Sequence, residues 1–126
     1  MTKLGGGLRA LIVVLIVLST AAAHGQGEGV RLARDSRSRY VVTVAADASA
    51  PEKHAAEEVA LYLRQITGGR FAIMAPEEAG RKPVIAVGPA AARVVDPALN
   101  LEKAELGDDG IVIKVVGQSL VLSGAE

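Results

Sequence analysis

The chain has 126 residues with no cysteine, no tryptophan and only two tyrosines and one phenylalanine, and its 14 basic residues are balanced by 14 acidic ones. The lack of cysteine excludes a disulfide framework and a thiolate metal site. The balanced charge excludes bulk attraction to nucleic acid or to an anionic membrane.

The N-terminal segment has the order of an export signal. Lys3 and Arg9 flank a glycine-rich start, an unbroken apolar run covers 10–18, and small residues end at Ala23. Basic, apolar and small-residue regions in this order are typical of a signal peptide, and the apolar run is shorter than the roughly 20 residues of a membrane span. We predict a signal peptide over 1–23, cleaved after Ala23, and a secreted or periplasmic protein without a stable membrane span after cleavage. A retained N-terminal anchor is the alternative.

Cleavage removes two positive charges and leaves 12 basic against 14 acidic residues, a net charge near −2. An exported protein without cysteine is more typical of bacteria than of eukaryotes, so we expect a bacterial source. Residues 24–29 are polar and glycine-rich and are predicted to form a linker. The remaining residues, 30–126, are enough for one domain with its own core.

The first half of this domain is predicted to carry one long helix after a buried strand. Segment 30–39 is expected to include a short edge strand, and segment 40–45, which is β-branched on both faces, a buried strand. Ser49 and Glu52 have the spacing of a capping box, and the glycine pair at 68–69 can end a helix in the left-handed conformation. The helix between them, of about 16 to 18 residues, is expected to bury one apolar face formed by Ala55, Ala56, Val59, Ala60, Tyr62, Leu63 and Ile66.

Two further strands and a short helix are predicted after the long helix. Segment 71–74 alternates briefly, with Phe71 facing the core, and segment 84–87 is apolar throughout, which is typical of a strand buried on both faces. Segment 89–95 can form a short helix, whereas 96–106 is predicted to be irregular.

A C-terminal β-hairpin completes the predicted fold. Segments 111–116 and 119–123 flank Gly117 and Gln118, and glycine at the first turn position predicts a type II′ turn. The fold class is therefore α+β, a mixed β-sheet with one long amphipathic helix packed on a face and no comparable helix on the second face.

Two pairs of residues in the sequence resemble catalytic groups. His54 and Glu58 are four apart on the helix and can act as a base with an orienting carboxylate, although a solvated pair in the first turn is the simpler interpretation. No second histidine follows at zinc-helix spacing. Asp108 and Asp109 are neighbours that fit turn chemistry better than a glycosidase pair, whose two carboxyl groups lie roughly 5–10 Å apart on opposite sides of a sugar.

Four arginines cluster around Asp35, and they have two interpretations. They can bind a phosphate or an acidic glycan, or they can form a charged, solvated sheet edge that resists aggregation. Nucleic acid would require interleaved aromatic residues or a basic helix, and neither is present. The four are Arg31, Arg34, Arg37 and Arg39.

Gly88 and Pro89 follow a strand, as in a nucleotide-binding turn, but the glycine patterns of such turns are absent. Proline also removes a backbone N–H that a phosphate would need. We therefore predict no catalytic residue, no cofactor-binding residue and no metal ligand in this chain, and no cofactor.

Several segments together resemble one known accessory domain. Ala50–Gly69 resembles the "A-A-E-E-L…Y-L…I-T-G" helix of the domain that precedes the catalytic barrel in family 20 β-N-acetylhexosaminidases and family 67 α-glucuronidases. Val84–Gly88 is similar to its "I-x-V-G" strand, 107–113 to its hairpin entry "L-x-x-E-G-(F/Y)-x-I", and Leu120–Gly124 to its exit "L-x-I-x-G". Ile111 stands where the family usually has an aromatic residue.

The resemblance covers 30–126 and implies a non-catalytic N-terminal domain of an exported glycoside hydrolase of carbohydrate metabolism. Its partner would be a catalytic (β/α)8 barrel in the same parent chain, and a glycan its possible substrate. The family's catalytic acids lie in the barrel, so none is carried onto this sequence. A second helix that packs on the sheet follows in such families, so we expect this domain to be incomplete at its C-terminal end. The alternative is a stand-alone exported protein that binds a glycan or an acidic ligand through the arginines.

Overall fold

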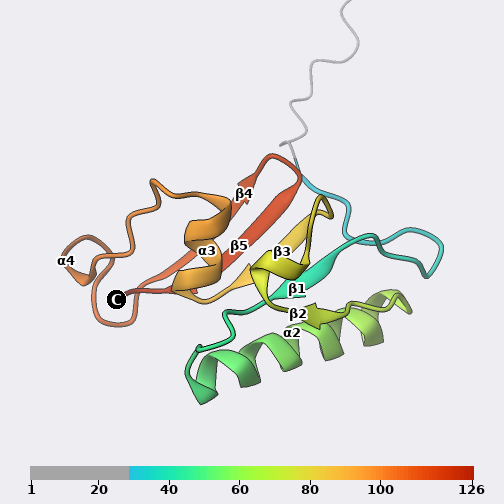
Figure 1. Ribbon diagram of the computed structural model, residues 1–126, viewed down its shortest axis with the longest axis horizontal. Helices are drawn as coiled ribbons and strands as arrows, with labels where there is room; N and C mark the ends of the chain where they lie inside the picture. The colour runs from blue at the N-terminus through green and yellow to red at the C-terminus, as the bar shows by residue number, and fades with distance from the viewer. Residues whose placement is uncertain (1–28) are drawn as a thin grey trace, which may run out of the picture.

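A five-stranded mixed sheet forms the centre of the protein. The computed structural model describes residues 29–126 (Figure 1), so the predicted signal peptide over 1–23 and nearly all of the linker lie outside the described residues. The strand order is β2-β1-β3-β5-β4. Neighbours from β2 to β5 run parallel, and only β4 pairs antiparallel to β5. The predicted α+β class with a mixed sheet is confirmed.

Two of the three interior strands, β1 and β3, are buried on both faces along their whole length. Every residue of β1 (Val41–Thr43) and of β3 (Val84–Val87) is buried. β2 (Ile73–Met74) pairs with β1 and forms one edge of the sheet. Parallel strands covered on both faces need such continuous apolar runs, which is why the sequence identified β1 and β3.

Helix α2 (Ala50–Thr67) has 18 residues and begins and ends where its sequence predicts. The backbone N–H of Ser49 donates to the Glu52 carboxylate at 2.7 Å, and the Glu52 N–H donates back to the Ser49 hydroxyl at 3.4 Å, which completes the capping box. Gly68 ends the helix with a φ of 73°. The helix then packs across β1, β2 and β3.

Only part of the predicted apolar face of α2 is buried. Ala56 is fully buried and Leu63 is half-buried, but Ala55, Tyr62 and Ile66 are exposed, Tyr62 by 55% and Ile66 by 78%. The prediction that Tyr62 faces the core was wrong. The physical reason is position: α2 lies over the β2-β1-β3 half of the sheet, and Ala55 and Tyr62 border the uncovered β5-β4 half.

Each face of the sheet has its own core. Side chains alternate between faces along a strand, so Val42 and Ile85 point toward α2 while Val41 and Ala86 point away from it. Phe71 is buried on the α2 side, as predicted. The second face is covered by α3 (Pro89–Val95), which packs on β3 and β5. As predicted, this second face carries no helix comparable to α2, since α3 has only 7 residues. The uncovered apolar area, however, lies beside α2 on the first face.

Two segments differ from their predictions. Segment 30–39 contributes no strand to the sheet, because Asp35 and Ser36 both have positive φ angles, 50° and 58°, and turn the chain back so that Arg34 and Arg37 pair only with each other. The expected edge strand was thus wrong. The region predicted to be irregular contains a single helical turn, α4 (Lys103–Leu106).

The C-terminal hairpin is formed as predicted by β4 (Ile111–Val116) and β5 (Ser119–Gly124). Gly117 has a φ of 60°, and Gln118 is not among the non-glycine residues with positive φ. A positive φ at the first central position alone fits the type II′ turn.

Candidate functional site

An apolar groove lies between α2 and the hairpin, on the half of the sheet face that α2 leaves uncovered. Ile113 pairs with Leu122 and Val115 with Leu120 across the hairpin. Leu120 and Leu122 pack against the core under α2. Residues directly opposite each other in an antiparallel pair share a face, so alternate β4 residues from Ile111 onward face the same side as α2.

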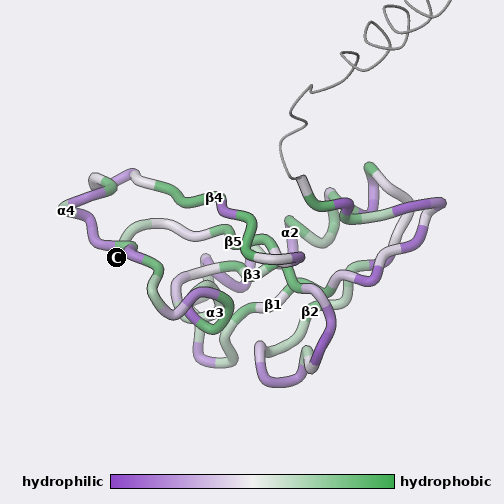
Figure 2. Tube along the Cα trace, turned by 90° about the horizontal axis from the view of Figure 1, so that it is seen from above, coloured by the Kyte–Doolittle hydropathy of each residue, from purple (hydrophilic) through white to green (hydrophobic). Residues whose placement is uncertain are grey.

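The apolar groove consists of two adjoining hollows of about 620 and 450 Å³, which share Ala55, Val59 and Leu122 among their lining residues. Ile111 and Ile113 form the hairpin wall and are 71% and 68% exposed. Figure 2 shows hydrophobic colouring along much of this hairpin. Contiguous exposed apolar surface of this kind is typical of an interaction site.

The rim of the apolar groove is acidic. Glu52 and Glu126 line one hollow and Glu58 the other, and neither lining set contains a lysine or an arginine. Glu52 is already engaged by the N-cap of α2. The groove therefore offers an apolar floor with negative charge at its border.

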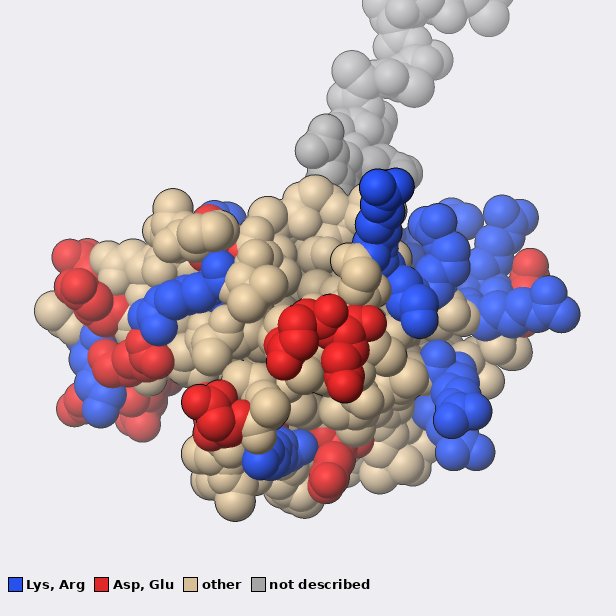
Figure 3. Space-filling view, viewed as in Figure 1, with Lys and Arg blue, Asp and Glu red and all other residues tan. Residues whose placement is uncertain are grey.

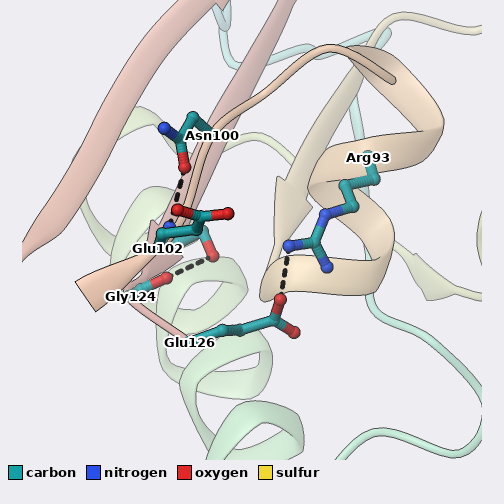
Figure 4. A network of polar contacts seen from close by, with 6 residues as sticks. Arg93, Asn100, Glu102, Gly124 and Glu126 are labelled. Carbon is teal, nitrogen blue, oxygen red and sulfur yellow. Dashed lines mark hydrogen bonds and ion pairs between the residues drawn. The ribbon is translucent and has the colours of Figure 1, made fainter. Parts of the chain in front are cut away.

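The end of the described chain is held at this rim (Figure 4). The Glu126 carboxylate pairs with the Arg93 guanidinium of α3, and the Glu126 backbone N–H donates to the Leu101 carbonyl at 2.8 Å. The Asn100 side chain accepts from the Glu102 N–H at 2.9 Å and shapes the loop beside it. These contacts fix where the backbone leaves β5.

The two catalytic-looking pairs of the sequence lie in solvent. Nε2 of His54 is 3.4 Å from the Glu58 carboxylate and Nδ1 is 3.8 Å from that of Glu57, and all three side chains are exposed. This geometry fits a solvated pair on a helix. Asp108 and Asp109 are exposed in the turn between α4 and β4.

Gly88 is the first residue of the strand-to-helix turn and has a φ of 89°. A Cβ at this position would lie 3.0 Å from Oε1 of Glu52, so the carboxylate of the α2 capping box occupies the space beside the turn. A carboxylate there repels an anionic ligand. The turn therefore packs against the N-terminal end of α2 and is not suited to a phosphate.

Residues 29–126 contain neither a candidate metal site nor a candidate membrane span. No group of three or more His, Asp or Glu side chains in this range could hold a metal ion. None of the helices in the same range combines the length and the apolar character needed to cross a bilayer.

The arginines of the sequence have basic neighbours that sequence reasoning did not single out. Arg39 lines a hollow of about 930 Å³ together with Arg70, Arg81 and Lys82. Arg70 precedes β2, whereas Arg81 and Lys82 precede β3. The amino ends of neighbouring parallel strands lie at the same end of a sheet. The placement of basic residues just before successive strands was the signal available in the sequence.

One ion pair links the loop after α3 to the hairpin on the far side of the sheet from the apolar groove. The Lys114 ammonium donates to the Asp96 carboxylate at 2.7 Å. This hydrogen bond holds the pKa of Asp96 below its ordinary value.

The chain matches no protein-family model, no curated protein and no solved structure. The resemblance to the glycosidase accessory domain therefore stays a prediction.

Proposed function

We propose that residues 30–126 form a non-catalytic accessory domain of an exported glycoside hydrolase, and that the apolar groove seats a segment that follows Glu126 in the parent protein. The observation that carries this proposal is the exposure of Ile111 and Ile113 on a face whose other half is closed by α2. Each Å² of apolar surface removed from water stabilises a protein by roughly 25 cal/mol, so a covering segment would gain from this contact.

The shape of the apolar groove favours a helix as the covering segment. Strands form its floor and α2 forms one wall, so a second helix laid beside α2 would complete a layer of helices on this face. The contacts of Glu126 with Arg93 and Leu101 direct the backbone toward this rim. Such a helix would then connect the domain to a catalytic barrel.

The residues that carry the resemblance have structural roles in the fold. Ser49 and Glu52 cap α2, Gly68 ends it, and Gly88 is packed by the Glu52 side chain. These roles support a scaffold whose motifs specify packing rather than chemistry. A hydrolase of glycosides is the activity we assign to the parent protein, on the strength of the sequence resemblance.

Single thiols provide the test, because the chain has no cysteine of its own. Ile113→Cys reports on the apolar groove and Val94→Cys, exposed on α3, is its matched control. Each variant is made in the isolated chain and in the longer product read from the gene, and the rate of alkylation of each labelled peptide is followed by mass spectrometry. We expect the longer product to slow alkylation at position 113 by about tenfold or more and to leave position 94 unchanged.

The longer product should also hydrolyse an N-acetylhexosaminide or a glucuronide that the isolated chain does not. Equal alkylation at position 113 in both proteins would contradict the docking role. A stop codon directly after Glu126 would contradict the accessory-domain proposal and favour the alternative, a stand-alone binding protein.

A further inference from the structure

A strip of basic side chains follows the end of the domain opposite α4, and it is separate from the apolar groove. Figure 3 shows Lys and Arg gathered at one end of the molecule, whereas acidic residues prevail at the other. Two hollows, of about 930 and 490 Å³, lie along the strip and share Ser38, Arg39 and Tyr40. The basic strip consists of Arg31, Arg34, Arg37, Arg39, Arg70, Arg81 and Lys82.

The positive charge of the basic strip is largely uncompensated. Within residues 29–126 only Arg34 of the strip forms an ion pair, with Asp35 at 3.6 Å. Glu78 is the sole acid among the described residues that line the larger hollow, and its carboxylate accepts from the Ala75 N–H at 3.1 Å. Six cations thus face solvent without an acidic partner, so an anionic ligand would not have to displace an internal ion pair from them.

The loop that carries four of these arginines is held in place before any ligand arrives. The Ser38 hydroxyl donates to the Leu32 carbonyl at 2.6 Å and accepts from the Tyr40 N–H at 3.0 Å. The Tyr40 hydroxyl donates to the Gln118 carbonyl in the hairpin turn. A loop fixed in this way loses little conformational freedom on binding.

The C-terminal end of α2 packs against this loop. A Cβ on Gly68 would lie 2.9 Å from the Ser36 hydroxyl oxygen, and one on Gly69 would lie 3.5 Å from the Arg37 carbonyl carbon. This close packing brings Arg70 next to the arginine loop. The strip is therefore assembled by the fold from separate segments of the sequence.

We propose that the basic strip binds a linear acidic polysaccharide, with its guanidinium groups paired to successive carboxylates of the glycan. Arginine presents a planar fork of donors that matches a carboxylate with two hydrogen bonds, and six of the seven cations are arginines. Two hollows that share residues form a track, and an extended polyanion follows a track better than a single phosphate does.

Other polyanionic partners fit the strip less well. Single-stranded nucleic acid stacks its bases on exposed aromatic rings, but Tyr40 and Phe71, the aromatic residues nearest the strip in sequence, are each only 5% exposed. A membrane-binding surface adds apolar side chains that enter the bilayer. Among residues 29–126, none of the large exposed hydrophobic side chains lines either hollow of the basic strip.

Calorimetry with the purified chain tests this site, using hexagalacturonate as the acidic probe and maltohexaose as a neutral probe of equal length. We expect the acidic probe alone to bind, and binding to weaken as NaCl rises from about 50 to about 300 mM. The double variant Arg70→Gln/Arg81→Gln should weaken binding by about tenfold or more, because it removes two charge-assisted contacts.

The matched control is Lys53→Gln/Lys103→Gln, which removes the same charge from exposed positions outside the strip and should change binding by less than about twofold. Thermal melts confirm that each variant is folded. Equal loss in both double variants, equal binding of maltohexaose, or no binding of the acidic probe would overturn the proposal. Binding of inorganic phosphate or of anionic lipid vesicles with no response to hexagalacturonate would also overturn it. Because this test uses the isolated chain, it stands or falls independently of docking at the apolar groove.

Discussion

The two halves of the sheet face beneath α2 have similar side chains and opposite surroundings. On the β1-β3 half, Val42 and Ile85 are completely buried under the helix. On the β5-β4 half, Ile111 and Ile113 point to the same side and are about 70% exposed. Because the side chains of the two halves are similarly apolar, the difference in burial comes from α2, which covers one half and not the other.

The comparison has a functional meaning. A domain gains stability from every apolar side chain it covers, and the covering segment that we propose would extend this gain to the open half. The basic strip differs from both halves, because its exposed groups are charged and are stable in water without a cover. The two surfaces therefore suit different partners: an apolar helix on one and an anionic glycan on the other.

The largest expected effect comes from truncating the closed half. Ile85→Ala removes a completely buried side chain from the centre of the sheet and should lower the free energy of unfolding by about 2–5 kcal/mol. Ile113→Ala, in the open half, should change it by less than about 0.5 kcal/mol in the isolated chain. Urea denaturation of both variants measures the difference. A large loss for Ile113→Ala would break the comparison, because it would mean that the groove is already covered in solution.

A smaller effect is expected from the end of the helix that closes the first half. Ser49→Ala deletes the hydroxyl that caps α2 and accepts from the Glu52 N–H, and should cost about 1 kcal/mol. Gln65→Ala, exposed within the same helix, serves as the control and should be close to neutral. Thermal unfolding followed by circular dichroism compares the two. Equal stability of Ser49→Ala and the unsubstituted chain would show that the capping box does not hold α2 over the sheet.

The smallest effect concerns the opposite face, where Lys114 binds Asp96. Because the hydrogen bond lowers the pKa of Asp96 in the folded state, its contribution is fully present above the unfolded pKa, which is about 3.9. That contribution is lost as pH falls through the lower folded pKa, when the carboxylate takes up a proton. Lys114→Met should therefore flatten the acid limb of the denaturation midpoint below about pH 4 and leave its dependence near pH 7 to 9 unchanged.

If the denaturation midpoint of the unsubstituted chain falls in acid no faster than that of Lys114→Met, the lowered pKa of Asp96 is not due to Lys114. Asp96→Asn should reproduce the flattening. High salt should reduce the difference, since the pair lies near the surface.

Local patterns predicted the helices and the paired strands well. The capping box and Gly68 located α2, the apolar run located β3, and the glycine turn located the β4–β5 hairpin, because each depends on neighbours in the chain. The edge strand expected in segment 30–39 is absent because the chain turns back at Asp35 and Ser36, which both have positive φ angles. Tyr62 was placed in the core because helical periodicity marks an apolar face without showing how wide a surface covers it.

The sequence by itself determined where α2 and the hairpin lie, that β1 and β3 are buried, and that His54 and Glu58 share one helix face. Only the tertiary structure decided that α2 leaves half a sheet face open and that Arg70, Arg81 and Lys82 join the arginine loop. The physical reason is that turns, helix caps and the spacing of apolar residues depend on neighbours a few residues apart. The basic strip and the apolar groove depend instead on the order in which the strands lie in the sheet. The parallel arrangement of β2, β1 and β3 brings basic residues that are far apart in the sequence to one end of the sheet, and no local pattern encodes that strand order.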